Sequence, residues 1–310
     1  MSSKNALALN LLALFLVLAN PQYATSPVAF YSPLAAAAGK SRAANFTEVT
    51  TKSQPQGVLW TSRKYVDSPY GNQVVNILDI DPAVVELRAV KTQYSDKYES
   101  VLSMGDRTNA IAGVNGGFFC YIEDDICISP ALCEQPEKMP RCPRGVQGRS
   151  LLIVDGRLES PNCASRTSFG LTESGKPIIQ TVGADQRWPG VRFAVGAGPN
   201  LVTDGAKNIT AEGFCWYAEA HPRTVVAIAT NEHILFITVD GRHAGADGMT
   251  IDGLAAFLVS EFHVRSAMNL DGGGSTTTYF QRRIVNKPSD PFCDRGCRCV
   301  YDGLFAYPKS

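Results

Sequence analysis

The sequence lacks an excess of charge of either sign. Its 310 residues carry 29 basic and 29 acidic side chains, and 45% of the residues are hydrophobic. A chain without net charge has no long-range attraction for nucleic acid, so no nucleic-acid partner is expected. The length and the hydrophobic content are enough to bury a sizeable core, and the expected class is therefore a globular protein.

Long hydrophobic runs are absent beyond the N-terminus. The apolar run over residues 6–19 has the length of the hydrophobic part of a signal peptide and is shorter than a typical membrane span. We expect residues 1–24 to be a signal peptide, residues 25–55 to be an Ala/Ser/Pro-rich linker or propeptide, and residues 56–310 to form the folded domain. An uncleaved membrane anchor is the alternative for the first segment. No second run of spanning length follows, so no membrane span is expected in the mature chain.

Histidine is scarce, and the pattern of histidine and cysteine does not indicate a metal site. The four histidines show no ligand spacing, and the cysteines lack the two matching pairs at two-residue spacing that make a zinc site recognisable. No cofactor is expected, and a metal-dependent phosphodiesterase is the least favoured function.

All nine cysteines lie between Cys120 and Cys299, in clusters over residues 120–142 and 293–299 and at two positions between them. In an oxidising compartment such clusters form disulfide bonds that cross-link loops. Because nine is odd, at least one thiol is free or pairs between chains. Glycosylation sequons at Asn45 and Asn208 agree with a secreted or lumenal protein of the secretory pathway, including the Golgi and the lysosome.

Short β-branched runs separated by turns dominate the rest of the chain. They cover residues 73–80, 84–90, 110–119, 149–158, 223–230 and 233–242. One segment differs, because Thr250 can cap a helix in which apolar residues recur at helical spacing, namely Ile251, Leu254, Leu258 and Phe262. The expected fold is α+β, a single domain with a large, mainly antiparallel sheet and few helices.

An acid followed by three glycines ends one of the apolar stretches. Gly272, Gly273 and Gly274 have no Cβ, so their backbone N–H groups can approach an anion such as phosphate closely. The carboxylate of Asp271 repels phosphate unless it is protonated, metal-bound or directed at a different atom, such as a sugar carbon. A tight turn with an ordinary aspartate is the alternative interpretation.

A second strand ends in the same way. Asn115 is followed by Gly116 and Gly117, and then by Phe118 and Phe119, which can form an apolar wall for a sugar or for the core. Two strand ends with this pattern suggest one site that is built from distant segments. An Asn-Gly hairpin turn is the alternative.

Two further segments carry charged side chains at strand ends. Arg223 begins a strand and offers a planar guanidinium suited to phosphate or carboxylate, with a surface charge as the alternative. Asp240 and Arg242 either face the same site or belong to a plain type I′ turn.

Taken together, these segments resemble the phosphodiester glycosidase domain family. The resemblance runs from about residue 58 to residue 307 and is most specific over residues 223–277. Its motifs occur in the family's order: AGVNGGFF, GAGPNLVTDG, HPRTVVAIA, ITVDGR with GMTIDGLAAFLVSE, SAMNLDGGGSTT, and then NKPSD.

The resemblance implies hydrolysis of the bond between an anomeric sugar carbon and a phosphodiester oxygen. The implied substrate is α-N-acetylglucosamine 1-phosphate linked to another sugar or polymer, such as the sugar of a glycoprotein, and the products are a free sugar and a phosphomonoester. A secreted carbohydrate- or phosphoglycan-binding module without turnover is the alternative.

The same resemblance assigns roles to the residues. Asp271 is the nucleophile or electrostatic stabiliser, Asp240 or a carboxyl within residues 120–142 is the acid, and Arg223 holds phosphate with the three glycine amides. Asn115 binds a sugar hydroxyl or a phosphate oxygen. The remaining expected substrate-binding residues are Gly116, Gly117, Arg242, Ser275 and Thr276.

Overall fold

A computed structural model of the chain describes residues 46–53, 57–120, 148–184, 186–212, 217–290, 293 and 296–309. Residues 43–310 form one compact unit. The expected signal peptide, most of the expected linker, and the cysteine-rich residues 121–147 lie outside the described residues.

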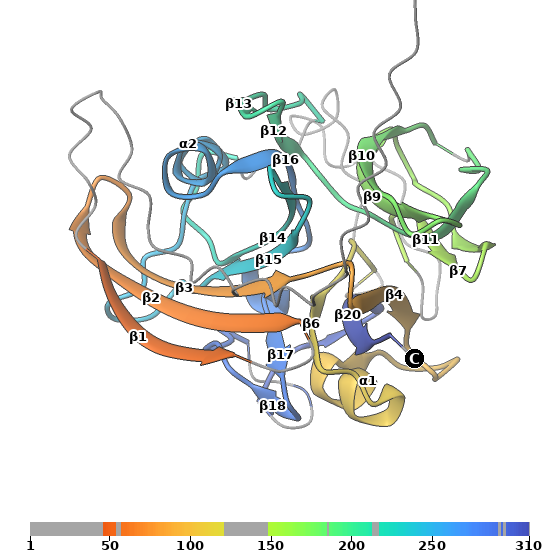
Figure 1. Cartoon of the computed structure of the whole chain (residues 1–310), viewed down its shortest axis with the longest axis horizontal. Helices are drawn as coiled ribbons and strands as arrows, with labels where there is room; N and C mark the ends of the chain where they lie inside the picture. The colour runs from red at the N-terminus through yellow and green to blue at the C-terminus, as the bar shows by residue number, and fades with distance from the viewer. Residues whose placement is uncertain are drawn as a thin grey trace, which may run out of the picture. The chain divides into compact units, whose positions relative to one another are not determined.

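Within the described residues, the strands form four sheets in which every pairing is antiparallel (Figure 1). The largest contains, in spatial order, β1 (Phe46–Ser53), β2 (Val58–Ser68), β3 (Gly71–Ile80), β15 (Ile234–Val239), β14 (Arg223–Ala229), β16 (Val264–Asn269), β12 (Asn200–Thr203) and β13 (Ala206–Lys207). A second contains β10 (Pro177–Val182), β9 (Arg166–Thr172), β11 (Val191–Gly196), β7 (Leu152–Val154) and β8 (Arg157–Ser160). The third contains β18 (Arg283–Ile284), β17 (Thr278–Phe280), β6 (Ala112–Asn115), β20 (Asp302–Pro308) and β4 (Val85–Lys91), and the smallest pairs β19 (Cys299–Val300) with β5 (Glu99–Ser100).

The α+β fold with a large antiparallel sheet and few helices is confirmed. Each β-branched run expected from the sequence overlaps at least one observed strand, and residues 149–158 overlap the β7–β8 hairpin, in which Asp155 and Gly156 adopt positive φ. Strand β1 pairs with β2 and brings part of the range 25–55, assigned above to a linker or propeptide, into the large sheet.

The two α-helices of the described chain begin at hydroxyl caps. Helix α2 (Ile251–Glu261) starts after Thr250, whose Oγ1 accepts a hydrogen bond from the Gly253 N–H at 3.0 Å, as its sequence predicts. Helix α1 (Val101–Thr108) was not anticipated. Its cap is Ser100, and its sequence is too short and too polar to show clear helical periodicity.

Strand β14 is buried on both faces, and its alternating side chains separate two apolar clusters. Val225 and Ala227 pack in the cluster that includes α2, whereas Val226 and Ile228 pack in the cluster that includes β6, β17 and β20. Figure 1 shows α2 and the β6–β20 sheet on opposite sides of β14 and β15. The first residues of β14 therefore lie close to both layers.

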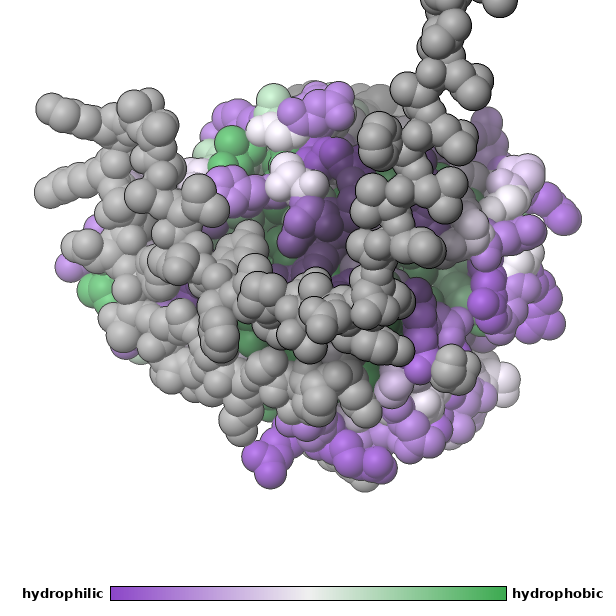
Figure 2. All heavy atoms as spheres, viewed as in Figure 1, coloured by the Kyte–Doolittle hydropathy of each residue, from purple (hydrophilic) through white to green (hydrophobic). Residues whose placement is uncertain are grey.

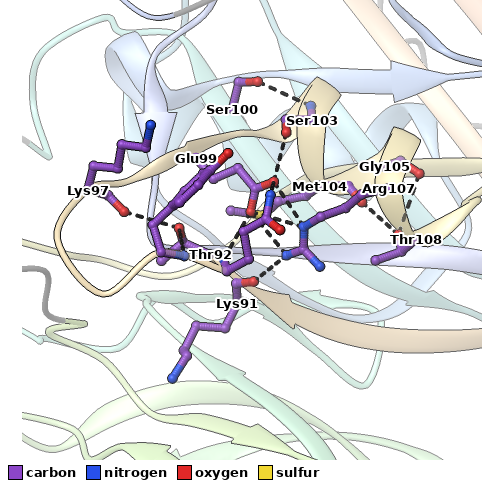
Figure 3. A network of polar contacts seen from close by, with 12 residues as sticks. Lys91, Thr92, Lys97, Glu99, Ser100, Ser103, Met104, Gly105, Arg107 and Thr108 are labelled. Carbon is purple, nitrogen blue, oxygen red and sulfur yellow. Dashed lines mark hydrogen bonds and ion pairs between the residues drawn. The ribbon is translucent and has the colours of Figure 1, made fainter.

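A buried carboxylate fixes the junction between β5 and α1 (Figure 3). Glu99 accepts hydrogen bonds from Nε and Nη2 of Arg107, at 2.9 and 3.0 Å, and from Oγ of Ser103 at 2.8 Å. Because Glu99 pairs with Val300 of β19, this network also holds the chain just before β20 begins.

Disulfide bonds are found among the described cysteines. Cys293 is bonded to Cys299, and Cys120 and Cys163 each take part in a disulfide bond. Cys297 is a free and buried thiol.

On the face shown in Figure 2, most of the coloured surface is hydrophilic. The exposed large hydrophobic side chains of the described residues lie on separate segments: Val66, Val84, Tyr94 and Val259. Neither described helix is long and apolar enough to cross a membrane.

Candidate active site

The two strand ends singled out in the sequence meet where the largest sheet contacts the sheet of β6. The Asn115 side chain, at the end of β6, accepts a hydrogen bond from Oγ1 of Thr224 on β14 at 2.9 Å. It also accepts from the Thr277 N–H at 3.1 Å and donates to the carbonyl of Asp271 at 2.7 Å. Asn115 is fully buried, so its amide joins the segments of the site to one another.

The loop after Asp271 contains an unusual concentration of unpaired hydrogen-bonding groups. Gly273 has a φ of +58°, and its N–H donates to the Pro222 carbonyl at 2.9 Å. No hydrogen bond to the described chain involves the N–H groups of Gly272 and Gly274. Three consecutive hydroxyls, each at most 1% exposed, also have no partner within the described chain: those of Ser275, Thr276 and Thr277.

Leaving a buried hydroxyl unpaired costs about 1–3 kcal/mol, so three in succession are unusual for a purely structural loop. A ligand with several acceptor oxygens satisfies such donors. The loop of residues 271–277 is therefore suited to binding an anion such as phosphate.

Arg242 lies over this loop. A Cβ built on Gly273 would be 3.3 Å from Nη2 of Arg242. The same Nη2 donates to Nδ1 of His221 at 3.2 Å, and Nε2 of His221 donates to Glu219 at 2.8 Å. Burial lowers the pKa of His221, and the nearby guanidinium groups add to this against the opposing effect of Glu219. A neutral His221 orients an exposed arginine toward the glycines.

Arg298 is a second cation at the loop, and it was not among the site residues expected from the sequence. A Cβ on Gly274 would be 2.5 Å from Nη2 of Arg298, so the glycine provides the space that the guanidinium occupies. Asp290 pairs with Arg298, accepting from Nε at 2.7 Å. The available signal was the position of Arg298 between Cys297 and Cys299, which the sequence analysis interpreted only as part of a disulfide framework.

Arg223 is buried against backbone carbonyls. Its side chain is 1% exposed, with Nε donating to the Met249 carbonyl at 2.7 Å and Nη2 to the Glu219 carbonyl at 2.8 Å. Burial and the charge of Arg242 lower its pKa to about 10. A Cβ on Gly272 would be 3.7 Å from the Cα of Arg223, so its backbone adjoins the loop.

Asp240 reaches the loop through Asn286. The Asp240 carboxylate is 3% exposed and accepts from Nδ2 of Asn286 at 3.1 Å and from the Lys287 N–H at 3.2 Å. Nδ2 of Asn286 also donates to the Thr276 carbonyl at 3.0 Å. Burial raises the pKa of Asp240 to about 6, although both hydrogen bonds favour its charged form.

Asp302, a buried aspartate that the sequence motifs did not single out, accepts hydrogen bonds from the N–H groups of Gly116 and Gly117. The Gly117 N–H donates to Oδ1 of Asp302 at 2.7 Å, and the Gly116 N–H donates to the Asp302 carbonyl at 3.0 Å. A Cβ on Gly116 would be 3.0 Å from Cγ of Asp302, so only glycine leaves room for this carboxyl. Asp302 stands before a glycine at the start of β20, whereas Asp240 and Asp271 stand before a glycine just after a strand, and this shared Asp-Gly pair was the available signal.

No group of three or more His, Cys, Asp and Glu side chains is arranged to hold a metal ion in the part of the chain that the structure describes. The described groups of the candidate site are aspartates, arginines, hydroxyls and backbone amides.

The family model described as Phosphodiester glycosidase matches residues 108–305. A curated relative, the SPbeta prophage-derived uncharacterized protein YomE of Bacillus subtilis (strain 168), is 33% identical over 103 residues. That match covers 33% of this chain and only 16% of the relative's length.

Solved structures share the fold. The catalytic domain of zebrafish N-acetylglucosamine-1-phosphodiester alpha-N-acetylglucosaminidase, auto-inhibited by its pro-peptide, has a TM-score of 0.58 and 18% identity, with 86% of this chain and 83% of that chain covered. A putative exported protein from Burkholderia pseudomallei K96243 has a TM-score of 0.56 and 19% identity, with 76% and 74% covered. The family match spans well over half of the chain and includes the glycine loop, Arg242, Asp240 and Asn115, so the chain belongs to the phosphodiester glycosidase family.

Proposed function

We propose that the protein hydrolyses a sugar 1-phosphodiester, with α-N-acetylglucosamine as the sugar and another sugar or a polymer as the second substituent of the phosphate. The observation that carries this proposal is the loop of residues 271–277. A carboxylate stands at its start, and buried hydroxyls without partners in the described chain follow. One loop thus offers groups for both halves of such a substrate.

The phosphate half has donors and charge. The N–H groups of Gly272 and Gly274 and the three hydroxyls can donate to phosphate oxygens, and the guanidinium groups of Arg242 and Arg298 lie beside the same glycines. Charge-assisted hydrogen bonds from arginine are roughly twice as strong as neutral ones. In this proposal Arg298 joins the phosphate-binding residues, and Arg223, whose backbone adjoins the loop, contributes positive potential.

The sugar half is served by Asp271. Cleavage of a glycosidic bond places positive charge on the anomeric carbon, and a carboxylate next to that carbon stabilises it or attacks it. Water supplies a hydroxyl to the sugar and a proton to the departing phosphate. Directing Asp271 at carbon rather than phosphate removes the conflict between an acid and an anion site.

The reaction needs little general acid catalysis, because the phosphomonoester that departs is a good leaving group. Asp240 is the candidate acid, since a carboxyl with a pKa of about 6 keeps its proton to a higher pH than an ordinary aspartate and so can donate it near the working pH. Asn286 contacts both Asp240 and the Thr276 carbonyl, and this supports a role for Asp240 at the same loop.

We place this activity in the secretory pathway, in a secreted or lumenal form. The apolar run near the N-terminus and the Cys293–Cys299 disulfide support this location.

The test is incubation with the methyl phosphodiester of α-N-acetylglucosamine 1-phosphate, with and without a chelator. Free N-acetylglucosamine and methyl phosphate should form in both cases, and oxygen from isotopically labelled water should enter the sugar. Release of N-acetylglucosamine 1-phosphate instead would identify a phosphodiesterase. Binding of the diester without any cleavage would identify a non-catalytic binding module.

A further inference from the structure

Asp302 is a buried carboxyl beside the proposed active site, and it has no role in the proposed cleavage of the glycosidic bond. It begins β20 and is 2% exposed. Gly116 separates it from Asp271, because the Gly116 carbonyl accepts from the Asp271 N–H at 3.0 Å while the Gly116 N–H donates to the Asp302 carbonyl at 3.0 Å. The backbones of the two aspartates therefore flank a single residue, Gly116.

The groups around Asp302 do not neutralise a charge on it. Lys91 of β4 is its partner across the sheet, but Nζ of Lys91 is bonded to Glu159 at 2.5 Å. Tyr301 precedes it and, with a pKa raised by burial to about 12, stays neutral. Of the described cations none forms an ion pair with Asp302, and the neighbouring charged group that acts on it is Asp271.

Two carboxyl groups so placed do not both ionise at low cost. Burial raises the pKa of Asp302 to about 7, the Gly117 N–H opposes this rise, and the negative charge of Asp271 adds to it. Asp302 is enclosed, whereas Asp271 is half-buried at the loop, so burial favours the protonated form of Asp302.

We propose that Asp302 is a positioning residue that holds a proton beside Asp271, so that the pair carries one negative charge in the active protein. Loss of this proton to solvent places a second negative charge behind the site that binds the phosphodiester. The catalytic part of this inference rests on the proposed function, whereas the holding of the proton does not.

The first measurement needs no activity. Thermal unfolding of the full chain and of its Asp302→Asn variant is followed from about pH 5 to about pH 8.5, on either side of the neutral range. Asparagine resembles the protonated carboxyl and cannot ionise. Because the pKa is raised in the folded state, stability falls as pH rises between the unfolded-state and folded-state pKa values, so the melting temperature of the parent should fall relative to that of the variant from about pH 5 to about pH 7 and then level off. A difference that does not change with pH would overturn the proposal.

The second measurement compares kcat/KM for the methyl phosphodiester, whose single charge does not change over this range. The ratio of Asp302→Asn to parent should rise about tenfold between roughly pH 6 and pH 8.5, because only the parent gains the second charge. Taking the ratio cancels any titration of Asp240. Asp79→Asn, which changes a half-buried aspartate on β3 that pairs with His233, should give a constant ratio.

The two measurements separate the possible failures. A pH-dependent stability difference with a constant kcat/KM ratio would show that the proton is held but does not act in the reaction, and the positioning role would fall. If the parent does not cleave the diester, the proposed function fails, and unfolding alone decides whether Asp302 holds the proton.

Discussion

The side-chain amide of Asn115 donates a 2.7 Å hydrogen bond to the backbone carbonyl of Asp271. This contact joins the end of β6 to the loop after β16, two segments far apart in the sequence. The side-chain oxygen of Asn115 accepts hydrogen bonds from Thr224 and Thr277. Asn115 lies on β6, so a residue of a second sheet fixes the backbone of Asp271 at the start of the glycine loop. The backbone of Asp271 is thereby fixed while its side chain remains half-buried.

Replacing Asp271 by asparagine should abolish most turnover and leave binding intact. The change keeps the size and removes the charge, so kcat should fall by on the order of 10³-fold. KM should be unchanged or lower, because repulsion of the phosphate is relieved. Steady-state kinetics checks this, with Asp252→Asn, an exposed aspartate paired with Lys207, as the control. A folded Asp271→Asn variant at the parental rate would make Asp240 the next candidate.

The unpaired hydroxyls should matter for the substrate and not for the fold. Thr276→Val and Thr277→Val should leave the free energy of unfolding unchanged or raise it by about 1 kcal/mol, while KM rises about tenfold. Thr278→Val is the matched control, because its hydroxyl bonds Thr238 at 2.6 Å, and it should lower stability by about 1 kcal/mol without changing KM. Equal destabilisation by all three variants would remove the argument for an anion-binding loop.

The arginines should divide into two kinds. Arg298→Ala and Arg242→Ala should raise KM by about tenfold or more, because each loses a charged donor to phosphate. Arg223→Ala should lower turnover by about 10²-fold and also lower the melting temperature, since the carbonyls of Met249 and Glu219 lose a buried donor. Kinetics and thermal unfolding of the same preparations decide this. Parental KM values for the first two variants would remove them from the site.

Asp240 should contribute a pH-dependent term to stability. Its folded-state pKa of about 6 lies above the ordinary aspartate value of about 3.9. The stabilisation that comes from protonated Asp240 is therefore fully present below about pH 4, and it is lost as the pH rises to about 6. Between these limits the parent should lose up to about 3 kcal/mol of unfolding free energy relative to Asp240→Asn. Denaturant unfolding from about pH 4 to pH 8 measures the difference. A curve parallel to the variant's would contradict the assignment.

Cys297 should be the thiol that remains free between two paired cysteines. Burial raises its pKa, so alkylation of the folded protein should spare it. Alkylation after unfolding without reductant, followed by peptide mapping, should label Cys297 and leave Cys293 joined to Cys299. Recovery of Cys297 in a disulfide would contradict the expected pairing.

Short sequence patterns predicted much of the fold. Strand β3 and the β14–β15 hairpin are long β-branched runs between turns, and α2 combines a hydroxyl cap with apolar residues at helical spacing. Helix α1 gave no such signal, because it is short and is held by tertiary contacts such as the hydrogen bond from the Tyr307 hydroxyl to Oγ1 of Thr108. Patterns over a few residues predict elements that propensity favours and miss those that packing imposes.

The sequence by itself determined that the site would be formed from strand ends rich in acids and glycines, because acid-glycine pairs at the ends of apolar runs are visible without a structure. Only the tertiary structure decided which acids meet. Asp302 approaches Asp271 through Gly116, and Arg298 enters the space left by Gly274, in contacts between segments far apart in the chain. Whether a charge is buried, paired or opposed depends on such contacts, and so does the proton of Asp302.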